Sequence, residues 1–371
     1  MEVKEKALLI GFQLPRGMSL KAEESLEELK LLALTAGARI EGEHIDKLSR
    51  INPAHFMGRG KVEELKREVE AKEVDLVILD EDLSPTQNRN LEEALGVKVI
   101  DRTGIILDIF ARRARTSEGK IQVELAQLNY LLPRLPGKGV LLSRLGGGIG
   151  TRGPGETKLE LDRRRVKERI ARLRRRMIKV TKTRELHRKK RILPLISIVG
   201  YTNSGKTTLF NRLTSAEAFA EDKLFATLDP LVRGITLKGG TRALVSDTVG
   251  FIRKLPHQLV AAFKATFEEI SQADLLINVI DISHPAAKEQ TEVVEGVLEE
   301  MGLKHKPIIH ALNKIDRLPT GLIPSWHRGL KEWVAISALR GDGLEELKKR
   351  ISYHIKEGTS SVRILPRAAP E

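Results

Sequence analysis

The sequence contains no cysteine, only nine histidines and no long hydrophobic run. The absence of cysteine excludes a disulfide framework, a thiolate zinc site and a cysteine nucleophile. The histidines are scattered and form no H-E-x-x-H pattern, so a histidine metal cage is not expected, whereas a divalent ion bound by oxygen atoms fits the composition. No apolar run approaches the roughly 20 residues of a membrane span, and the ALLIGF run near the N-terminus is too short for a signal peptide. We therefore expect a cytoplasmic protein without a membrane span.

The positive charge of the chain lies in one stretch. The 371 residues favour two or three domains and carry a formal net charge of +14. Residues 111–191 contain 25 Lys or Arg against 7 Asp or Glu, a net charge of +18, whereas the remaining residues contain 39 against 43, a net charge of −4. A solvated helix face is the simplest explanation of a charge run, but the arginine triplets at 163–165 and 174–176 exceed what nearby carboxylates could pair. The pattern therefore favours a polyanionic partner.

Residues 1–110 alternate short apolar runs with leucine patterns at helical spacing. The runs predict strands at 7–11, 38–41, 74–80 and 97–101, and the patterns predict helices at 20–35, 61–72 and 85–95. This alternation indicates a small parallel α/β subdomain. Asp80 ends a strand, but no acidic pair follows the first strand to complete a phospho-acceptor site, so we predict a structural role for it. The basic glycine turn at 55–61 is typical of a helix start, although it would also suit a phosphate.

Residues 105–190 show a helical pattern with one interruption. The first predicted helix has one apolar face and ends near Pro133; the face consists of Ile121, Leu125, Leu128 and Leu132. The second, over 156–189, would be about 50 Å long, and its seam has the 4-3-4-3 spacing of a coiled coil: Leu159, Val166, Ile170, Leu173, Met177 and Val180. Two such helices joined by a loop would form a basic antiparallel hairpin over residues 111–190.

The loop of this hairpin, residues 146–156, contains six glycines. Two interpretations remain open. The loop is either a flexible linker or a hairpin tip whose bare backbone approaches RNA phosphates closely. In the second case Arg144, Arg152 and Lys158 would contact RNA at the tip. The candidates for RNA contact on the adjoining helix, Arg163, Arg164 and Arg165, follow from the charge excess in either case.

Residues 191–358 form a second α/β pattern, and residues 359–371 are a short C-terminal tail. Apolar strand-like runs recur at 193–200, 243–247, 275–281, 307–313 and 333–337. Helical segments separate most of them. This order predicts a doubly wound sheet of the nucleotide-binding type.

A phosphate-binding P-loop pattern follows the first of these strands and precedes a helix at 208–213, which is the context such a motif requires. Its glycines let backbone N–H groups converge on phosphate oxygens, Lys206 would bind the β- and γ-phosphates, and the Thr207 hydroxyl suits Mg²⁺. The predicted nucleotide contacts here are Gly200, Tyr201, Thr202, Asn203, Ser204, Gly205, Lys206, Thr207 and Thr208.

Two further motifs at strand ends select guanine. The carboxylate of Asp316, in the sequence Asn313-Lys314-Ile315-Asp316, can accept hydrogen bonds from both N1–H and N2–H of guanine, which adenine cannot supply. Ser337-Ala338 ends the next strand and can present a backbone amide to the guanine oxygen. Since these motifs follow the P-loop in the correct order, the sequence predicts a GTP-binding domain.

The residues between these motifs indicate a magnesium-dependent hydrolytic site. Asp247 would hold Mg²⁺ with Thr207, and the Gly250 amide would lie near the γ-phosphate. Thr227, in a segment that begins with Phe225, is the candidate switch threonine that meets Mg²⁺ when the γ-phosphate is present. We therefore assign Lys206, Thr227 and Gly250 to hydrolysis and Phe225 to nucleotide binding. Phe251 stands where many small GTPases have a water-orienting Gln, so intrinsic hydrolysis should be slow.

Longer stretches of the chain resemble signatures of the HflX family of ribosome-associated GTPases. These stretches are HFMGRGKVEEL, DIFARRARTSEGKIQVELAQLNYLLPRL, GGGIGTRGPGETKLELDRRR, GYTNSGKTTLFNRLT, KLFATLDP, DTVGFI and NKID. The resemblance covers nearly the whole chain, and among GTPases the RGPGET segment is specific to this family.

The resemblance implies an α/β fold in which a small parallel subdomain and a long helical hairpin precede a P-loop GTPase domain. It also implies binding to the large ribosomal subunit and its RNA near the subunit interface, with the hairpin tip directed towards the peptidyl transferase centre, and GTP-dependent splitting of stalled or idle ribosomes. The family likewise has a hydrophobic residue at the position of Phe251. Asn203 matches the P-loop asparagine that coordinates K⁺ in related GTPases, so potassium stimulation is a hypothesis. We expect a monomer.

Two other functions remain open. GTP could switch a factor that binds or assembles ribosomal subunits, with hydrolysis only as a timer. The second alternative is an NTP-driven RNA remodelling enzyme. Use of ATP by such an enzyme would conflict with Asp316, which selects guanine over adenine. Some bacterial members of the family carry a further C-terminal domain, whereas here only residues 358–371 follow the last predicted helix, so contacts through that domain are not carried over.

Overall fold

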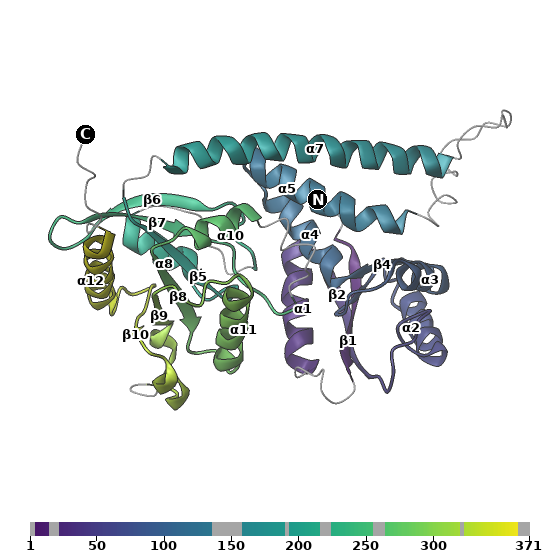
Figure 1. The fold of residues 1–371 in the computed structure, drawn as a ribbon. Coiled ribbons are helices and arrows are strands. Elements are labelled where there is room, and N and C mark those ends of the chain that lie inside the picture. Colours follow the sequence, from purple (N-terminus) through teal and green to yellow (C-terminus); the bar gives the residue numbers. More distant parts are fainter. Residues whose placement is uncertain are drawn as a thin grey trace. The chain divides into compact units, whose positions relative to one another are not determined.

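A computed structural model describes residues 4–14, 22–135, 158–189, 193–215, 224–254, 264–319 and 323–362. The chain divides into two compact units, and the boundary between them falls within one long helix, after Lys182. The elements are labelled in Figure 1. No helix in these ranges is long and apolar enough to span a membrane. The two units are described separately.

The first unit is built on a four-stranded parallel sheet with the strand order β2-β1-β3-β4. Its elements are β1 (Lys6–Gln13), α1 (Ala22–Ala36), β2 (Arg39–Lys47), α2 (Arg59–Ala71), β3 (Leu76–Leu79), α3 (Pro85–Leu95), β4 (Lys98–Asp101), α4 (Arg102–Arg113), α5 (Ser117–Leu131), the short 3₁₀ helix η1 (Leu132–Arg134) and α7 (Lys158–Lys189). The four apolar runs predicted as strands form this sheet, and the predicted parallel α/β fold is confirmed.

Local sequence explains the ends of these elements. All four residues of β3 are buried, as expected for a central parallel strand covered on both faces. Ser84 and Gln87 form a capping box at the start of α3, and Gly96 ends that helix in the left-handed conformation.

Asp80 is buried and receives hydrogen bonds from Ser25 at 2.5 Å and Arg102 at 2.6 Å, which agrees with a structural role.

The helical region is interrupted earlier than predicted. Helix α4 ends at Arg113, because Ala114 adopts an extended conformation. Thr116 then caps α5 by accepting a hydrogen bond from the Gly119 amide at 2.9 Å. The prediction of a single interruption between residues 105 and 190 is therefore wrong. The predicted face of α5 is correct in part, since Ile121 is buried and the three leucines are half-buried.

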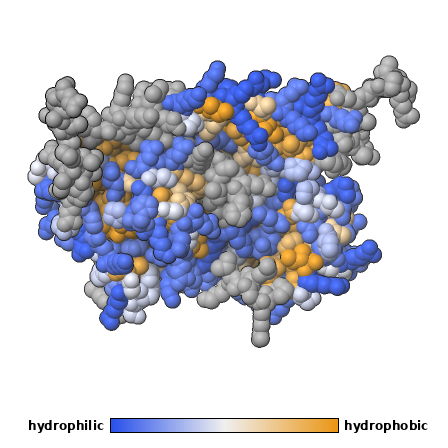
Figure 2. Space-filling model, in the orientation of Figure 1, coloured by the Kyte–Doolittle hydropathy of each residue, from blue (hydrophilic) through white to orange (hydrophobic). Residues whose placement is uncertain are grey.

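Helix α7 contains 32 residues, a length of about 48 Å. Among its described side chains, the predicted seam is confirmed: Ile170 and Leu173 are buried, and Val166, Met177 and Val180 are half-buried. Arg169 joins α7 to α5 through a two-pronged ion pair with Glu124, at 2.6 and 3.0 Å. The arginine triplets lie outside the seam and are exposed, and hydrophilic side chains line the top edge of the view in Figure 2.

The second unit contains a six-stranded sheet with the order β10-β9-β8-β5-β7-β6, in which only the β6–β7 pair is antiparallel. Its elements are β5 (Leu195–Gly200), α8 (Lys206–Thr214), β6 (Leu231–Thr236), β7 (Arg242–Asp247), α10 (Lys264–Ser271), β8 (Leu275–Asp281), α11 (Ala287–Glu300), β9 (Ile308–Asn313), η2 (Ile315–Arg317), η3 (Ser325–Gly329), β10 (Trp333–Ala335) and α12 (Leu344–Val362). Strand β6 was not predicted. Helix α12 includes the first residues assigned to the C-terminal tail.

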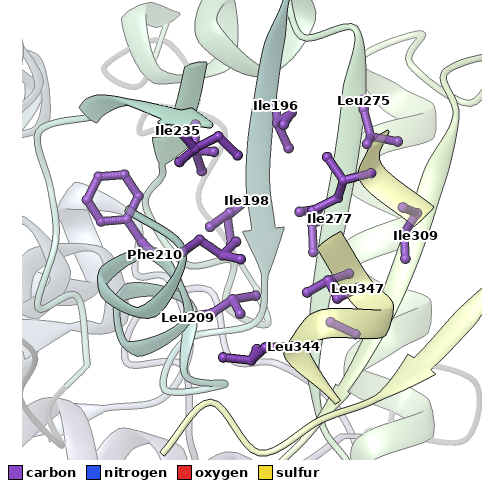
Figure 3. Close-up of a cluster of buried hydrophobic side chains, with 14 of the residues drawn as sticks. Ile196, Ile198, Leu209, Phe210, Ile235, Leu275, Ile277, Ile309, Leu344 and Leu347 are labelled. Carbon is purple, nitrogen blue, oxygen red and sulfur yellow. The ribbon is translucent and has the colours of Figure 1, made fainter. Parts of the chain in front are cut away.

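Strand β5 is held in place by a hydrophobic core that it shares with α8, β8 and α12. Figure 3 shows Ile198 of β5 near Leu209 of α8, with Ile277 of β8 and Leu347 of α12 in the same cluster, and all four side chains are fully buried. Strand β5 pairs with β7 on one side and β8 on the other. Its carboxyl end is therefore a topological switch point, where open α/β sheets bind their ligands.

Candidate nucleotide-binding site

The predicted P-loop is a tight turn between β5 and α8 that requires glycine at two positions. Gly200 has a φ of +144°, and a Cβ there would lie 2.4 Å from the Val279 carbonyl oxygen. Gly205 has a φ of +96°, and a Cβ there would lie 2.3 Å from Asn313 Nδ2. Because neither position has room for a side chain, the loop can wrap closely around a phosphate.

Lys206, the first residue of α8, is buried inside the loop. Its Nζ donates a hydrogen bond of 2.6 Å to the Tyr201 carbonyl oxygen. Burial lowers the pKa of Lys206 to about 8, and the nearby carboxylate of Asp247 opposes part of this shift. A nucleotide phosphate would supply the anionic partner that a buried ammonium requires.

Three oxygen-bearing side chains assigned to Mg²⁺ converge beside this lysine. The Thr207 hydroxyl lies 2.8 Å from Asp247 Oδ2, the Thr227 hydroxyl lies 3.0 Å from the same oxygen, and the two hydroxyls are 2.9 Å apart. Burial raises the pKa of Asp247, while the hydrogen bond from Thr207 and the charge of Lys206 lower it. The other oxygen, Oδ1, is buried and has no hydrogen-bond partner among the described residues.

This donor set fits Mg²⁺. A hard cation of this size takes oxygen ligands and commonly binds through one or two carboxylates together with substrate phosphates. The described residues contain no cluster of three or more His, Asp or Glu side chains that could hold a metal alone. When bound with the nucleotide, Mg²⁺ would neutralise charge on the β- and γ-phosphates. P-loop GTPases generally use Mg²⁺ in this way, and the assignment to Thr207, Thr227 and Asp247 is a proposal.

The predicted switch segment and the P-loop line one cavity of about 60 Å³. Phe225 is buried with a φ of +56°, and it precedes Thr227 at the cavity wall. The cavity is lined by Thr202, Asn203, Gly205, Lys206, Thr207, Thr208, Phe225, Ala226, Thr227, Thr248 and Gly250. The structure thus brings the P-loop, the switch segment and the residues after β7 to one place.

Gly250 and Phe251 extend β7 alongside the P-loop. A Cβ on Gly250 would lie 2.8 Å from both Lys206 Nζ and Thr202 Cα, so this position requires glycine. The Phe251 amide donates to the Gly200 carbonyl at 3.0 Å. The Phe251 ring is buried and stacks on Phe267, with ring centroids 6.3 Å apart. The ring therefore has a packing role, and its carbon atoms cannot hydrogen-bond a water.

The two motifs predicted to bind guanine are hydrogen-bonded to the P-loop and to each other. Asn313 Nδ2 donates to the Ser204 carbonyl at 2.8 Å, and Asn313 Oδ1 accepts from the Ala338 amide at 2.9 Å. The Ser337 hydroxyl donates to Asp316 Oδ1 at 2.6 Å, and this hydrogen bond lowers the pKa of Asp316. The predicted residues at this end of the site therefore lie together, with Asp316 ionised.

The same end contains contacts that the sequence motifs did not reveal. Lys314 Nζ bridges the Asn203 carbonyl at 2.9 Å and the carboxylate of Asp281 at 2.6 Å. Asp281 ends β8, so its place at a strand end was an available signal. Arg212 on α8 donates to the carbonyls of Ala338, at 3.2 Å, and Leu339. No local pattern marks Arg212.

The predicted RNA contacts lie in the first unit or outside the described residues. Arg163, Arg164 and Arg165 are on the exposed side of α7. Lys158 is the first residue of that helix. Arg144 and Arg152, with the glycine-rich loop, lie outside the described residues.

Comparisons with known proteins decide the family. Residues 23–111, 113–191 and 195–314 match the family models described as GTP-binding GTPase N-terminal, GTP-binding GTPase Middle Region and 50S ribosome-binding GTPase. The GTPase HflX of Caldanaerobacter subterraneus subsp. tengcongensis is 52% identical over 98% of this chain and 83% of its own length. This chain belongs to the HflX family of GTPases.

Two further similarities agree with this family. The GTPase HflX of Escherichia coli strain K12 is 49% identical over 80% of this chain and 71% of its own length. A crystal structure of the SsGBP and GDP complex is 29% identical, covers 96% of this chain and 99% of the other, and has a TM-score of 0.52. The resemblance seen in the sequence is confirmed. As a member of the HflX family, the chain is an enzyme that binds GTP and GDP and hydrolyses GTP.

Proposed function

We propose that this GTPase binds the large ribosomal subunit and its RNA through the basic helix α7 and, in its GTP-bound form, splits or rescues stalled or idle ribosomes. The observation that supports the proposal is the exposed arginine surface of α7. The family model described as 50S ribosome-binding GTPase, over residues 195–314, points to the same partner.

The α7 surface has the character of a polyanion-binding site. Its apolar seam packs inwards, whereas Arg164 and Arg165 have side chains that are 65% and 77% exposed. Arg164 pairs with Glu168 and Arg165 pairs with Asp162, both on the same helix. Five more arginines are exposed and make no ion pair with a described side chain: Arg163, Arg172, Arg174, Arg175 and Arg176. This excess of unpaired guanidinium groups favours a phosphate backbone as the partner.

The nucleotide site would act as the switch for this binding. In the proposal, Lys206 would bind the β- and γ-phosphates, and the Gly250 amide would donate to the γ-phosphate. Thr207, Asp247 and, in the GTP-bound form, Thr227 would hold Mg²⁺, which would neutralise charge on the phosphates. The hydrogen bonds between Thr207, Thr227 and Asp247 support this assignment because they bring the switch segment to the P-loop. Hydrolysis would release Thr227 and end the ribosome-binding state.

Asn203 is the proposed potassium ligand. It lies in the P-loop with a φ of +59°, lines the cavity and is exposed. Its amide oxygen is a suitable ligand for a monovalent cation beside the phosphates. Rates of GTP hydrolysis measured in K⁺ and in Na⁺ test this assignment, and equal rates would remove it.

Sedimentation with purified large subunits tests the role of α7. With a non-hydrolysable GTP analogue, the unaltered protein should bind, whereas the triple variant Arg163→Glu, Arg164→Glu and Arg165→Glu should bind more weakly and with a flatter salt dependence. The matched control replaces the same three arginines by Lys, keeps the charge and should retain the salt dependence. GDP affinity of each variant reports whether the second unit is folded. Equal binding by the Glu and Lys variants would contradict the proposal.

A further inference from the structure

The hydroxyl of Thr202 is a buried polar group whose partner is missing from the chain itself. The residue is 7% exposed, and its Oγ1 has no hydrogen-bond partner among the described residues. Neighbouring Thr248, also buried, satisfies its hydroxyl by donating to the Ile198 carbonyl at 2.6 Å. Leaving a buried hydroxyl unsatisfied is unfavourable, and because Thr202 also lines the cavity, a ligand bound there can supply the missing partner.

Thr202 lies at the end of the cavity where the γ-phosphate is expected. It lines the cavity together with Thr227, the proposed γ-phosphate-dependent switch residue. Its Cα and Cγ2 lie 2.8 and 2.9 Å from the place of a Cβ on Gly250, and Lys206 Nζ lies 2.8 Å from the same place. The backbone and methyl group of Thr202, the Lys206 ammonium and the Gly250 backbone therefore lie close together, so the P-loop and the segment after β7 meet beside Thr202.

The backbone holds Thr202 at this point. Its amide donates to the Phe251 carbonyl at 2.7 Å, and the Phe251 amide donates to the Gly200 carbonyl. The residue is thus fixed to the segment after β7, while the Phe251 ring packs on Phe267 and leaves no polar side chain from position 251. The Thr202 hydroxyl is a polar group at this junction without a described partner.

We propose that the Thr202 hydroxyl donates a hydrogen bond to a γ-phosphate oxygen of GTP. The inference rests on the proposed nucleotide site and deepens it. GDP lacks the acceptor, so Thr202 selects GTP over GDP and holds the γ-phosphoryl group in place for hydrolysis.

Affinities for GDP and for a non-hydrolysable GTP analogue, measured on two variants, test the inference. Thr202→Val keeps the shape and removes the hydroxyl, and it should lower the affinity for the analogue about tenfold while changing the affinity for GDP less than about twofold. Thr202→Ser keeps the hydroxyl and should restore the preference for the analogue. Equal loss of both ligands, or no loss of either, would overturn the inference.

Two controls separate this inference from the site on which it rests. Lys206→Ala should lose both ligands; if it retains both, the nucleotide site itself is wrong. Ser204→Ala removes another buried P-loop hydroxyl without a described partner, but Ser204 does not line the cavity. It should shift both affinities by the same factor. If Ser204→Ala weakens only the analogue, the effect is not specific to Thr202 and the inference fails.

Discussion

Thr227 donates a hydrogen bond of 3.0 Å to Asp247, across 20 residues of sequence. Thr227 precedes β6 by four residues, and the first residue of β6, Leu231, pairs with Asp247 at the end of β7. The candidate switch threonine is therefore joined to the candidate metal carboxylate both by its side chain and by the sheet. Release of Thr227 after hydrolysis would act directly on the edge strand β6.

Asp247→Asn should raise the Mg²⁺ concentration needed for tight binding of a GTP analogue by about tenfold or more. The substitution removes the charge while keeping the shape, and Asp247 Oδ1 is the buried oxygen without a described partner. Analogue affinity measured over a Mg²⁺ titration gives the result. Asp108→Asn, an exposed carboxylate on α4, is the control. The same Mg²⁺ dependence in both variants would exclude Asp247 as a metal ligand.

Asp316→Asn should weaken GTP binding and allow xanthosine triphosphate to bind instead. The carboxylate accepts two hydrogen bonds from guanine, whereas an amide can donate to the second oxygen of xanthine. Competition between the nucleotides for the variant and the unaltered protein measures the exchange. Nucleotide preference that does not change would contradict the assignment and favour an enzyme that uses other nucleoside triphosphates.

Arg212→Met should speed the release of GDP by about fivefold or more, because it removes hydrogen bonds to the loop that follows β10. Arg212 donates to the Ala338 carbonyl, Ala338 donates to Asn313, and Asn313 donates to Ser204 of the P-loop, which leads back to α8. This closed series of hydrogen bonds would couple the proposed guanine-binding residues to the proposed phosphate-binding loop. The GDP dissociation rate is the readout, and Arg212→Lys, which keeps a single donor nitrogen in place of three, should give a rate between those of the Met variant and the unaltered protein. Identical rates in all three proteins would rule out this positioning role.

GDP affinity should decrease as the pH rises above about 8. The pKa of Lys206 in the nucleotide-free protein is lowered to about 8 by burial. Below that pH the ammonium is already charged, so binding takes up no proton; above it, binding must first recharge the lysine. Calorimetric titration at pH 7, 8 and 9 in buffers of different ionisation enthalpy measures the affinity and the proton uptake. Constant affinity without proton uptake would contradict the burial of a lysine that contacts phosphate.

The P-loop turn could be predicted from the sequence because its constraints are local. Gly200 and Gly205 are required where the backbone approaches Val279 and Asn313, and each motif directly follows an apolar strand. The seam of α7 was also predictable, since a 4-3-4-3 spacing specifies one packed face whatever lies beneath it.

The features that the sequence did not predict depend mainly on contacts between residues far apart in the chain. Strand β6 buries only Ile235 and contains Gly234, so no apolar run marks it; its pairing with β7 forms the strand. The break between α4 and α5 contains neither glycine nor proline, and its one signal was the capping residue Thr116. Arg212 reaches a partner 126 residues away, which no local pattern can indicate.

Light scattering of intact ribosomes tests the central claim most directly. The protein is mixed with ribosomes and a non-hydrolysable GTP analogue, and in parallel with GDP, and the scattering reports the fraction of intact ribosomes. We predict that scattering falls with the analogue and stays constant with GDP. Constant scattering with the analogue, from protein that still binds large subunits, would contradict ribosome splitting and would support a factor that only binds subunits, with hydrolysis as its timer.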